Sequence, residues 1–275
     1  MNLHRTSRSV AAAALGLTVV ALVGACGKSS PASPTVNAPI PAAQACAAIG
    51  GQTSGGLAIL NGAVCDPARS PVVRLNMRDV SGTHVGSCTG TIIGPRSILT
   101  AAHCVDAEVN MVRVWLGIPA DPELVAQSFV TWPNFVFNTP SSYDVAVVTM
   151  AEDLGRTPVS ILTSRDGVVG ETAILAGWGR DDVAATTNLR AGSTVLSAVT
   201  SAVLQTIFAP PSSSVCSGDS GGPLFLLQSG VWTQAGITSA TSQLACNDGT
   251  NIYQSVRHPS VLAFILQHVP AVGQR

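Results

Sequence analysis

The sequence predicts an all-β protein, a sandwich or a barrel, that ends in a single helix. Past residue 59, short runs rich in β-branched residues alternate with Gly, Pro, Ser and Asn, and such runs are typical of sandwiches and barrels. One helical pattern covers Pro259–His268, where apolar residues recur at helical spacing behind an initial proline. Long amphipathic helices do not alternate with the strands, which disfavours βαβ and helix-rich folds. The predicted strands include residues 72–75, 91–93, 112–115, 145–149, 172–175, 223–227 and 231–238.

Composition excludes two classes of protein. The chain has 275 residues, of which 11% are charged and 46% hydrophobic, and a net charge of −1. A nucleic-acid binder needs a cationic surface, which this chain lacks. The apolar content is too high for a disordered chain. The mean hydropathy of +0.38 raises the question of a membrane protein.

The apolar N-terminal run answers that question. Residues 10–26 carry no charge and follow His4, Arg5 and Arg8. A cationic start and a short apolar stretch indicate a secretory signal, and the run is shorter than the ~20 residues of a membrane span. Its end, LVGAC, resembles the lipobox of bacterial lipoproteins, which implies cleavage before Cys26 and a lipid on that thiol. The alternative is an ordinary cleaved signal with an incidental cysteine.

The segment after Cys26 is expected to be a spacer. Residues 27–45 read GKSSPASPTVNAPIPAAQA, which is dominated by Pro, Ser and Ala and shows no periodicity. Such composition is typical of a flexible to semi-extended linker. We therefore expect an exported protein, anchored by lipid to a bacterial membrane at the periplasmic or cell surface, or secreted.

The cysteine pattern favours disulfides over metal. If Cys26 carries lipid, six cysteines remain, and an exported chain is expected to pair them in one of 15 ways. There is no C-x-x-C pair and the five histidines are scattered, so we expect no metal site and no cofactor. The remaining cysteines are Cys46, Cys65, Cys88, Cys104, Cys216 and Cys246.

The segment CSGDSGGP, residues 216–223, holds a candidate nucleophile, Ser220. Glycines on both sides of this serine allow unusual dihedrals and the close approach of a substrate. The segment also fits G-x-S-x-G, the nucleophile elbow of α/β-hydrolase esterases. That elbow needs a helix after the serine, whereas residues 223–227 read as a strand, so the hydrolase interpretation is the weaker one.

Two further motifs supply a candidate base and acid. SILTAAHC, residues 97–104, contains His103, and histidine is the natural general base because it titrates near neutrality. SYDVAVV contains Asp144, directly ahead of an apolar strand. An aspartate in a triad accepts the Nδ1–H of the histidine and stabilises the imidazolium.

The motifs TAAHC, YDVAVV and CSGDSGGP, in this order, resemble the trypsin/chymotrypsin-like serine peptidases. The resemblance covers residues 59–275 and includes GWG at 177–179 and the ending from Ile252 through the last helix. It implies two six-stranded antiparallel β-barrels with a C-terminal helix, and a triad in the cleft between the barrels. The implied activity is that of a serine endopeptidase acting on proteins or peptides, as a monomer and without a cofactor.

The resemblance also assigns roles to residues. It makes His103 the general acid and base, Asp144 its orienting partner and Ser220 the nucleophile. Backbone N–H groups of Gly218 and Ser220 form the oxyanion hole, and Ser239 stands where a family serine bonds the triad aspartate. A protease fold without activity, serving as a binding module, is the alternative.

The same resemblance implies two disulfides. The two cysteines that remain could then form a third disulfide with each other. The family pairs correspond to Cys88–Cys104 and Cys216–Cys246. Cys46 and Cys65 then remain, and a bridge between them would keep a cleaved catalytic domain attached to its N-terminal stalk.

An activation site is implied at residue 59. Family members begin with a sequence like IVGG, and ILNG starts at Ile59. A freed Ile59 amine would pair with Asp219, and the small residue Ala58 before the cut suggests self-activation. The alternative is a strand in an uncut chain. The predicted organisation is a signal peptide over 1–25, a lipidated stalk or propeptide over 26–58 and the peptidase domain over 59–275.

The implied substrate pocket has no charge at its base. Ser214 lies six residues before the nucleophile, where trypsin-type enzymes carry an aspartate. Ser239-Ala240-Thr241 replaces the usual S-W-G wall, and Asn251 stands near a position that is normally glycine. Because Thr241 and Asn251 would narrow the pocket, we expect small uncharged P1 residues such as Ala, Val or Thr, where P1 precedes the scissile bond.

Overall fold

The structure of the chain is a computed structural model. The structure describes residues 40–57, 60–106, 108–139, 141–180, 188–243 and 245–275. The expected signal peptide, Cys26, Ala58 and Ile59 lie outside these residues. Within the described part of the chain, no helix has the length and apolar character needed to cross a membrane.

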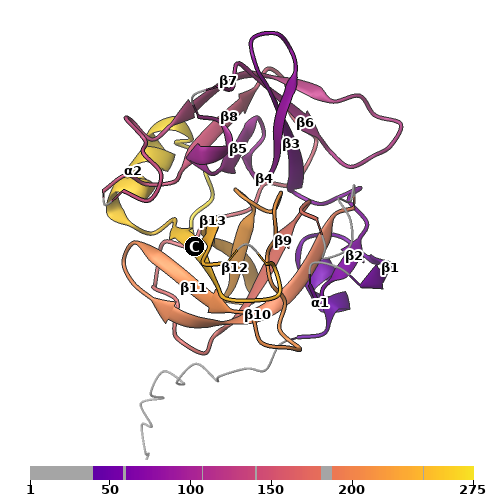
Figure 1. Ribbon diagram of the computed structural model, residues 1–275, viewed down its shortest axis with the longest axis vertical. Coiled ribbons are helices and arrows are strands. Elements are labelled where there is room, and N and C mark those ends of the chain that lie inside the picture. Colours follow the sequence, from indigo (N-terminus) through magenta and orange to yellow (C-terminus); the bar gives the residue numbers. More distant parts are fainter. Residues whose placement is uncertain (1–39, 58–59, 107, 140, 181–187, 244) are drawn as a thin grey trace, which may run out of the picture. The chain divides into compact units, whose positions relative to one another are not determined.

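Twelve of the strands form two antiparallel barrels (Figure 1). The first barrel closes in the order β3-β4-β5-β8-β7-β6. In the second barrel the order is β9-β10-β11-β14-β13-β12, and it closes because β9 pairs with both β10 and β12. The first barrel comprises β3 (Val72–Arg78), β4 (His84–Gly94), β5 (Ser97–Thr100), β6 (Met111–Trp115), β7 (Leu124–Thr131) and β8 (Ala146–Met150). The second comprises β9 (Thr172–Gly177), β10 (Arg190–Val199), β11 (Val203–Ile207), β12 (Pro223–Gln228), β13 (Val231–Thr241) and β14 (Thr250–Ser255).

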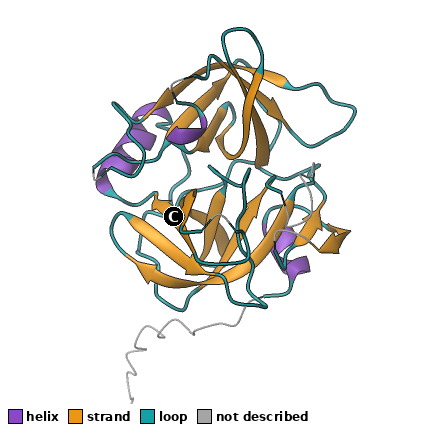
Figure 2. Cartoon of the chain, viewed as in Figure 1, coloured by secondary structure: helices purple, strands orange, loops and turns teal. Residues whose placement is uncertain are grey.

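The predicted fold class is confirmed: strands dominate the described chain and helices are few (Figure 2). Every run that the sequence marked as a strand falls within or across one of these strands. The predicted helix is α2, Pro259–His268, whose first turn is capped by the Nδ1 of His258, which accepts from Ser260 N at 3.3 Å. One face of α2 packs into the core of the first barrel through Val261, Phe264 and Ile265.

The segment before residue 59 contains folded structure. Helix α1 (Ala42–Ala48) precedes β1 (Thr53–Leu57), which pairs with β2 (Ala63–Cys65), and β2 in turn pairs with β10. Ile49 is fully buried, and Ser193 Oγ donates to Ile40 O at 2.8 Å. The spacer expected over residues 27–45 therefore does not extend past residue 41, because alanine-rich sequence favours a helix once one face can be buried.

A disulfide fixes this N-terminal segment to the second barrel. Cys46 of α1 is bonded to Cys65 of β2, and both are buried in one apolar cluster with Trp178. Cys88–Cys104 and Cys216–Cys246 are also bonded. These are the three pairs that the resemblance and the remaining cysteines led us to expect.

Candidate active site

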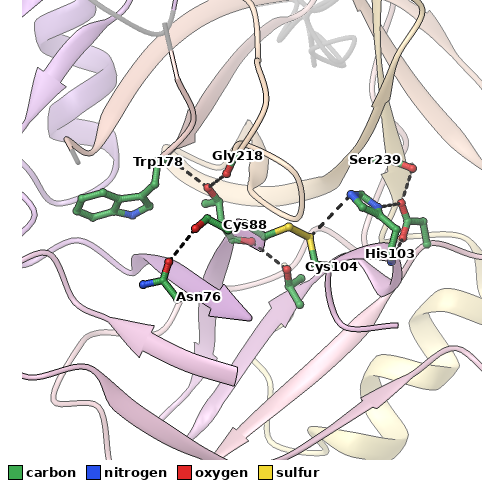
Figure 3. Close-up of a disulfide and its surroundings, with 11 residues drawn as sticks. Asn76, Cys88, His103, Cys104, Trp178, Gly218 and Ser239 are labelled. Atoms are coloured by element: carbon green, nitrogen blue, oxygen red, sulfur yellow. Dashed lines mark hydrogen bonds and ion pairs between the residues drawn. A yellow bond between two sulfur atoms is a disulfide. The ribbon is translucent and has the colours of Figure 1, made fainter. Parts of the chain in front are cut away.

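His103 and Asp144 are joined by a short hydrogen bond. His103 lies in the 3₁₀ turn η1 (Ala102–Cys104), and its Nδ1 is 2.7 Å from Asp144 Oδ2 (Figure 3). The backbone N–H of His103 donates to the other carboxylate oxygen at 3.0 Å. The Asp144 side chain is only 7% exposed, whereas 24% of the His103 side chain is accessible. The histidine is therefore oriented from the protein side and open on the substrate side.

The second barrel contributes two further bonds to Asp144. Ser239 Oγ on β13 donates to Asp144 Oδ2 at 2.6 Å, as the resemblance implied. Gln254 on β14 accepts the backbone N–H of Asp144 at 3.2 Å through Oε1, and its Nε2 donates to Ala202 O at 2.9 Å. Gln254 was not predicted from the sequence, because nothing in its local pattern distinguishes it from any other strand residue.

Ser220 and His103 line the same cavity, of about 550 Å³. Its floor includes the Cys88–Cys104 disulfide, and His103 Nε2 lies 3.8 Å from Cys104 Sγ. Among the hydrogen bonds between described residues, none joins Ser220 Oγ to the imidazole. On the other side, the ring of Phe137 stands edge-on to His103 with centroids 5.3 Å apart. Phe137 was not foreseen, because its loop gives no periodic signal.

The loop that carries Ser220 presents two free backbone donors. Gly218 has φ +96°, a conformation that side-chain-bearing residues rarely adopt, and an added Cβ would lie 2.9 Å from Gly179 Cα. Within the described part of the chain, neither Gly218 N nor Ser220 N donates to a protein acceptor. The Gly218 carbonyl accepts from Thr89 Oγ1 at 2.8 Å. The two N–H groups are therefore available to an oxyanion.

Asp219, between these donors, is buried and held by backbone. Its carboxylate accepts from Gly179 N at 2.8 Å and from Cys216 N at 2.9 Å. A Cβ on Gly177 or Gly179 would lie within 2.5 Å of this carboxyl group, which explains both glycines of the GWG motif. Burial raises the pKa of Asp219 to about 6, against the lowering effect of these N–H donors.

Two of the four residues expected to line the substrate pocket, Ser214 and Asn251, are hydrogen-bonded to each other. Ser214 and Asn251 are each 1% exposed, and their side chains are hydrogen-bonded at 3.1–3.2 Å. Asn251 Nδ2 also donates to Thr206 Oγ1 at 3.1 Å. Thr241 lies opposite Asn251 in the β13–β14 pairing and is exposed. The base of this region is thus uncharged and filled by an asparagine.

Cys88, His103 and Cys104 bring three potential ligand atoms within 4.8 Å of one another. Metal coordination by cysteine requires a thiolate. Both sulfurs are bonded to each other in the disulfide (Figure 3), so this group is not a metal centre.

The fold and the site define a class. Two antiparallel barrels, with a histidine–aspartate pair and a serine that is followed by two glycines lining one cavity, are the fold and the residue set of the two-barrel serine peptidases. A model of the trypsin family, described as "Trypsin", matches residues 59–265. The chain belongs to the trypsin family.

Curated relatives agree with this membership, and a solved structure shares the fold. The chain is 28% identical to chymotrypsin-like elastase family member 1 of Bos taurus over 193 residues, which is 58% of this chain and 70% of the relative. It is 28% identical to CLIP domain-containing serine protease B9 of Anopheles gambiae over 262 residues, 78% of this chain and 64% of that protein. A solved structure of HL collagenase aligns with a TM-score of 0.63 at 21% identity, over 79% of this chain and 98% of that one.

Proposed function

We propose that this chain is a serine endopeptidase in which Ser220, His103 and Asp144 form the catalytic triad. The observation that carries the proposal is the Asp144–His103 bond of 2.7 Å beside a cavity shared with Ser220. Membership of a serine peptidase family supports the reaction class. The finer assignments rest on position and geometry.

In the proposed mechanism each group has its own role. His103 takes the Ser220 proton as Oγ attacks the peptide carbonyl, and Asp144 stabilises the resulting imidazolium. Gly218 N–H and Ser220 N–H bind the oxyanion that develops in the tetrahedral intermediate. His103 then gives the proton to the departing amine, and water hydrolyses the acyl-enzyme by the same steps in reverse.

A serine-directed fluorophosphonate tests this proposal against the alternatives. We expect the wild type to be labelled at Ser220 and Ser220→Ala to be unlabelled and inactive. Absence of labelling in folded wild type that has been cut between Ala58 and Ile59 would favour the silent binding module. Labelling together with hydrolysis of esters but not of internal peptide bonds would favour an esterase.

We further propose a preference for small uncharged P1 residues. The support for this preference is that Asn251 and Ser214, the residues that the resemblance assigns to the pocket, are uncharged, buried and bonded to each other. Profiling on a peptide library with every P1 residue tests this. Greatest turnover after Ala, Val or Thr is expected, and greatest turnover after Lys or Arg would contradict the proposal.

Activation by cleavage between Ala58 and Ile59 is proposed from the resemblance. Leu60, the next residue, forms a β-bridge with Ser214, close to the proposed pocket. Ser220→Ala should accumulate uncut if activation is autocatalytic, and its normal cleavage in a pure preparation would contradict self-activation. The Cys46–Cys65 bond spans the proposed cut, so the two parts should separate on a gel only after reduction.

Export from the cytoplasm and lipidation at Cys26 are also part of the proposal. The disulfides fit an oxidising compartment outside the cytoplasm. Mass spectrometry of the protein from bacterial membranes should find a diacylglyceryl-modified Cys26 as the first residue. A water-soluble form that begins at another residue would contradict anchoring. Sedimentation of the lipid-modified protein in detergent should show a monomer.

A further inference from the structure

Thr89 holds the loop that carries the two free backbone donors. It lies on β4 of the first barrel and is fully buried. Its Oγ1 donates to Gly218 O at 2.8 Å, and its backbone N–H donates to Ser220 O at 2.8 Å. One residue of the first barrel thus binds the carbonyls of both residues whose N–H groups face the oxyanion in the proposed mechanism.

The direction of the side-chain bonds follows from counting protons. A threonine hydroxyl has one hydrogen, and the carbonyl of Gly218 can only accept it. The backbone N–H of Trp178, 3.0 Å from Thr89 Oγ1, therefore donates to that hydroxyl oxygen (Figure 3). The Thr89 hydroxyl thus accepts a hydrogen bond from Trp178 and donates one to Gly218, so it acts as acceptor and donor at the same time.

The loop needs such an anchor at this point. Glycine has the most freedom of any residue in φ and ψ, and Gly218 sits at φ +96°. The peptide after Gly218 is fixed at its other end by Asp219 N, which donates to Cys216 O at 2.9 Å. With Thr89 on the carbonyl, both ends of that peptide are fixed before substrate arrives, and it lies between the two peptides that carry the N–H groups of Gly218 and Ser220. Donors that are fixed in advance are the ones that stabilise a developing charge most effectively.

We infer that Thr89 is a positioning residue of the oxyanion hole, acting through the bond from its hydroxyl to the Gly218 carbonyl. This inference rests on the proposed function. It predicts that the hydroxyl contributes to transition-state stabilisation and little to the binding of substrate in its ground state. The backbone bond from Thr89 to Ser220 survives substitution, so a variant isolates the side-chain contribution.

Thr89→Val removes the hydroxyl and keeps the shape, and Thr91→Val is its matched control. Thr91 lies two residues along the same strand, is equally buried, and its Oγ1 has no partner within the described part of the chain. We expect Thr89→Val to lower kcat about 10- to 100-fold with little change in KM, less than the ~10²–10³-fold loss found on removing an oxyanion donor itself. Thr91→Val should keep the wild-type kcat, and Thr89→Ser should restore most of it.

A second readout separates positioning from general damage. A peptide boronic acid forms a tetrahedral adduct with the serine, whereas the matching peptide amide binds only in its ground state. We expect Thr89→Val to weaken boronate binding in step with kcat and to leave amide binding within about twofold. Equal weakening of both ligands, or a kcat no lower than that of Thr91→Val, would overturn the inference.

Fluorophosphonate labelling of the wild type is measured first. A wild type that has been cut between Ala58 and Ile59 and stays unlabelled overturns the proposed function and this inference together, whereas a labelled wild type with an unaffected Thr89→Val overturns the inference alone. Should Thr89→Val yield too little folded protein, Thr89→Ala removes the same hydroxyl. Its kcat is held to the same standard against Thr91→Val.

Discussion

Ser239 Oγ donates to the same oxygen of Asp144 that accepts the Nδ1–H of His103. The hydroxyl comes from the second barrel and the carboxylate from the first, so the bond crosses between the barrels at the proposed triad. Asp144 Oδ2 thereby has two strong donors and Oδ1 has the His103 backbone N–H. Such full satisfaction fixes an almost buried carboxylate in one orientation.

Ser239→Ala tests that bond. We expect kcat/KM to fall roughly 10- to 100-fold, because a hydrogen bond to a charged group contributes about 1.5–3 kcal/mol. Ser197→Ala is the control, since the Ser197 hydroxyl on β10 has no partner among described residues. Steady-state kinetics on one peptide would measure both, and equal activity of the two variants would contradict a role for Ser239.

Asn251→Gly tests whether the Asn251 side chain limits the size of the P1 residue. Removing the side chain vacates space between Ser214 and Thr206, so we expect the P1 preference to move from Ala toward Leu, Met or Phe. The ratio of kcat/KM for Phe over Ala should rise at least about tenfold, equivalent to ~1.4 kcal/mol. An unchanged ratio in a folded variant would show that Asn251 does not limit the P1 side chain.

Gln254→Met tests the support behind Asp144. The substitution leaves the buried Asp144 N–H without its acceptor, which costs about 1–3 kcal/mol, and we expect slower fluorophosphonate labelling of Ser220. Gln234→Met is the control, because Gln234 is another buried glutamine of the second barrel, bonded through Nε2 to Gly236 O. The melting temperature should fall in both variants, whereas the rate of fluorophosphonate labelling should fall only in Gln254→Met. Equal labelling rates would make Gln254 purely structural.

The buried carboxyl of Asp219 predicts a pH dependence of stability in the uncut chain. Its pKa in the folded chain is raised to about 6, so the folded state binds the proton more tightly than the unfolded state does. Its contribution is fully present below the unfolded pKa of about 3.9 and is lost as pH rises through about 6, by on the order of 3 kcal/mol in total.

Comparing Ser220→Ala with Ser220→Ala/Asp219→Asn measures this contribution, since neither chain can process itself. The difference in unfolding free energy between them should change with pH between about 4 and 6, with the aspartate chain losing ground as pH rises. A difference that moved in the opposite direction would mean that the attraction of the Arg190 cation outweighs the burial of Asp219.

How far the sequence predicted the structure depends on the range of the interactions. β-Branched runs identified strands such as β3 and β13, and Pro259 marked the start of α2, because these signals are local. β10, which reads RAGSTVLSAV, escaped notice because its small and polar residues are buried between neighbouring strands. Helix α1 was missed because its stability comes from a disulfide and a tertiary contact.

The site shows the same division. His103, Asp144 and Ser220 stood out because each lies in a distinctive motif, and the structure brings the first two into contact. Thr89 and Gln254 could not be found, since their importance lies in which backbone atom of another barrel they meet. That information is present only once the barrels are packed.

The Cys46–Cys65 bond extends the folded domain to residues that precede the family match, which starts at residue 59. A recombinant chain begun at residue 59, where the family match starts, would lack α1 and leave Cys65 with an unpaired thiol. It would also uncover the apolar surface that Ala45 and Ile49 cover beside Trp178. Two such chains could then join through their free thiols. Expression of the enzyme should therefore retain the residues from 40 onward and take place where disulfides form.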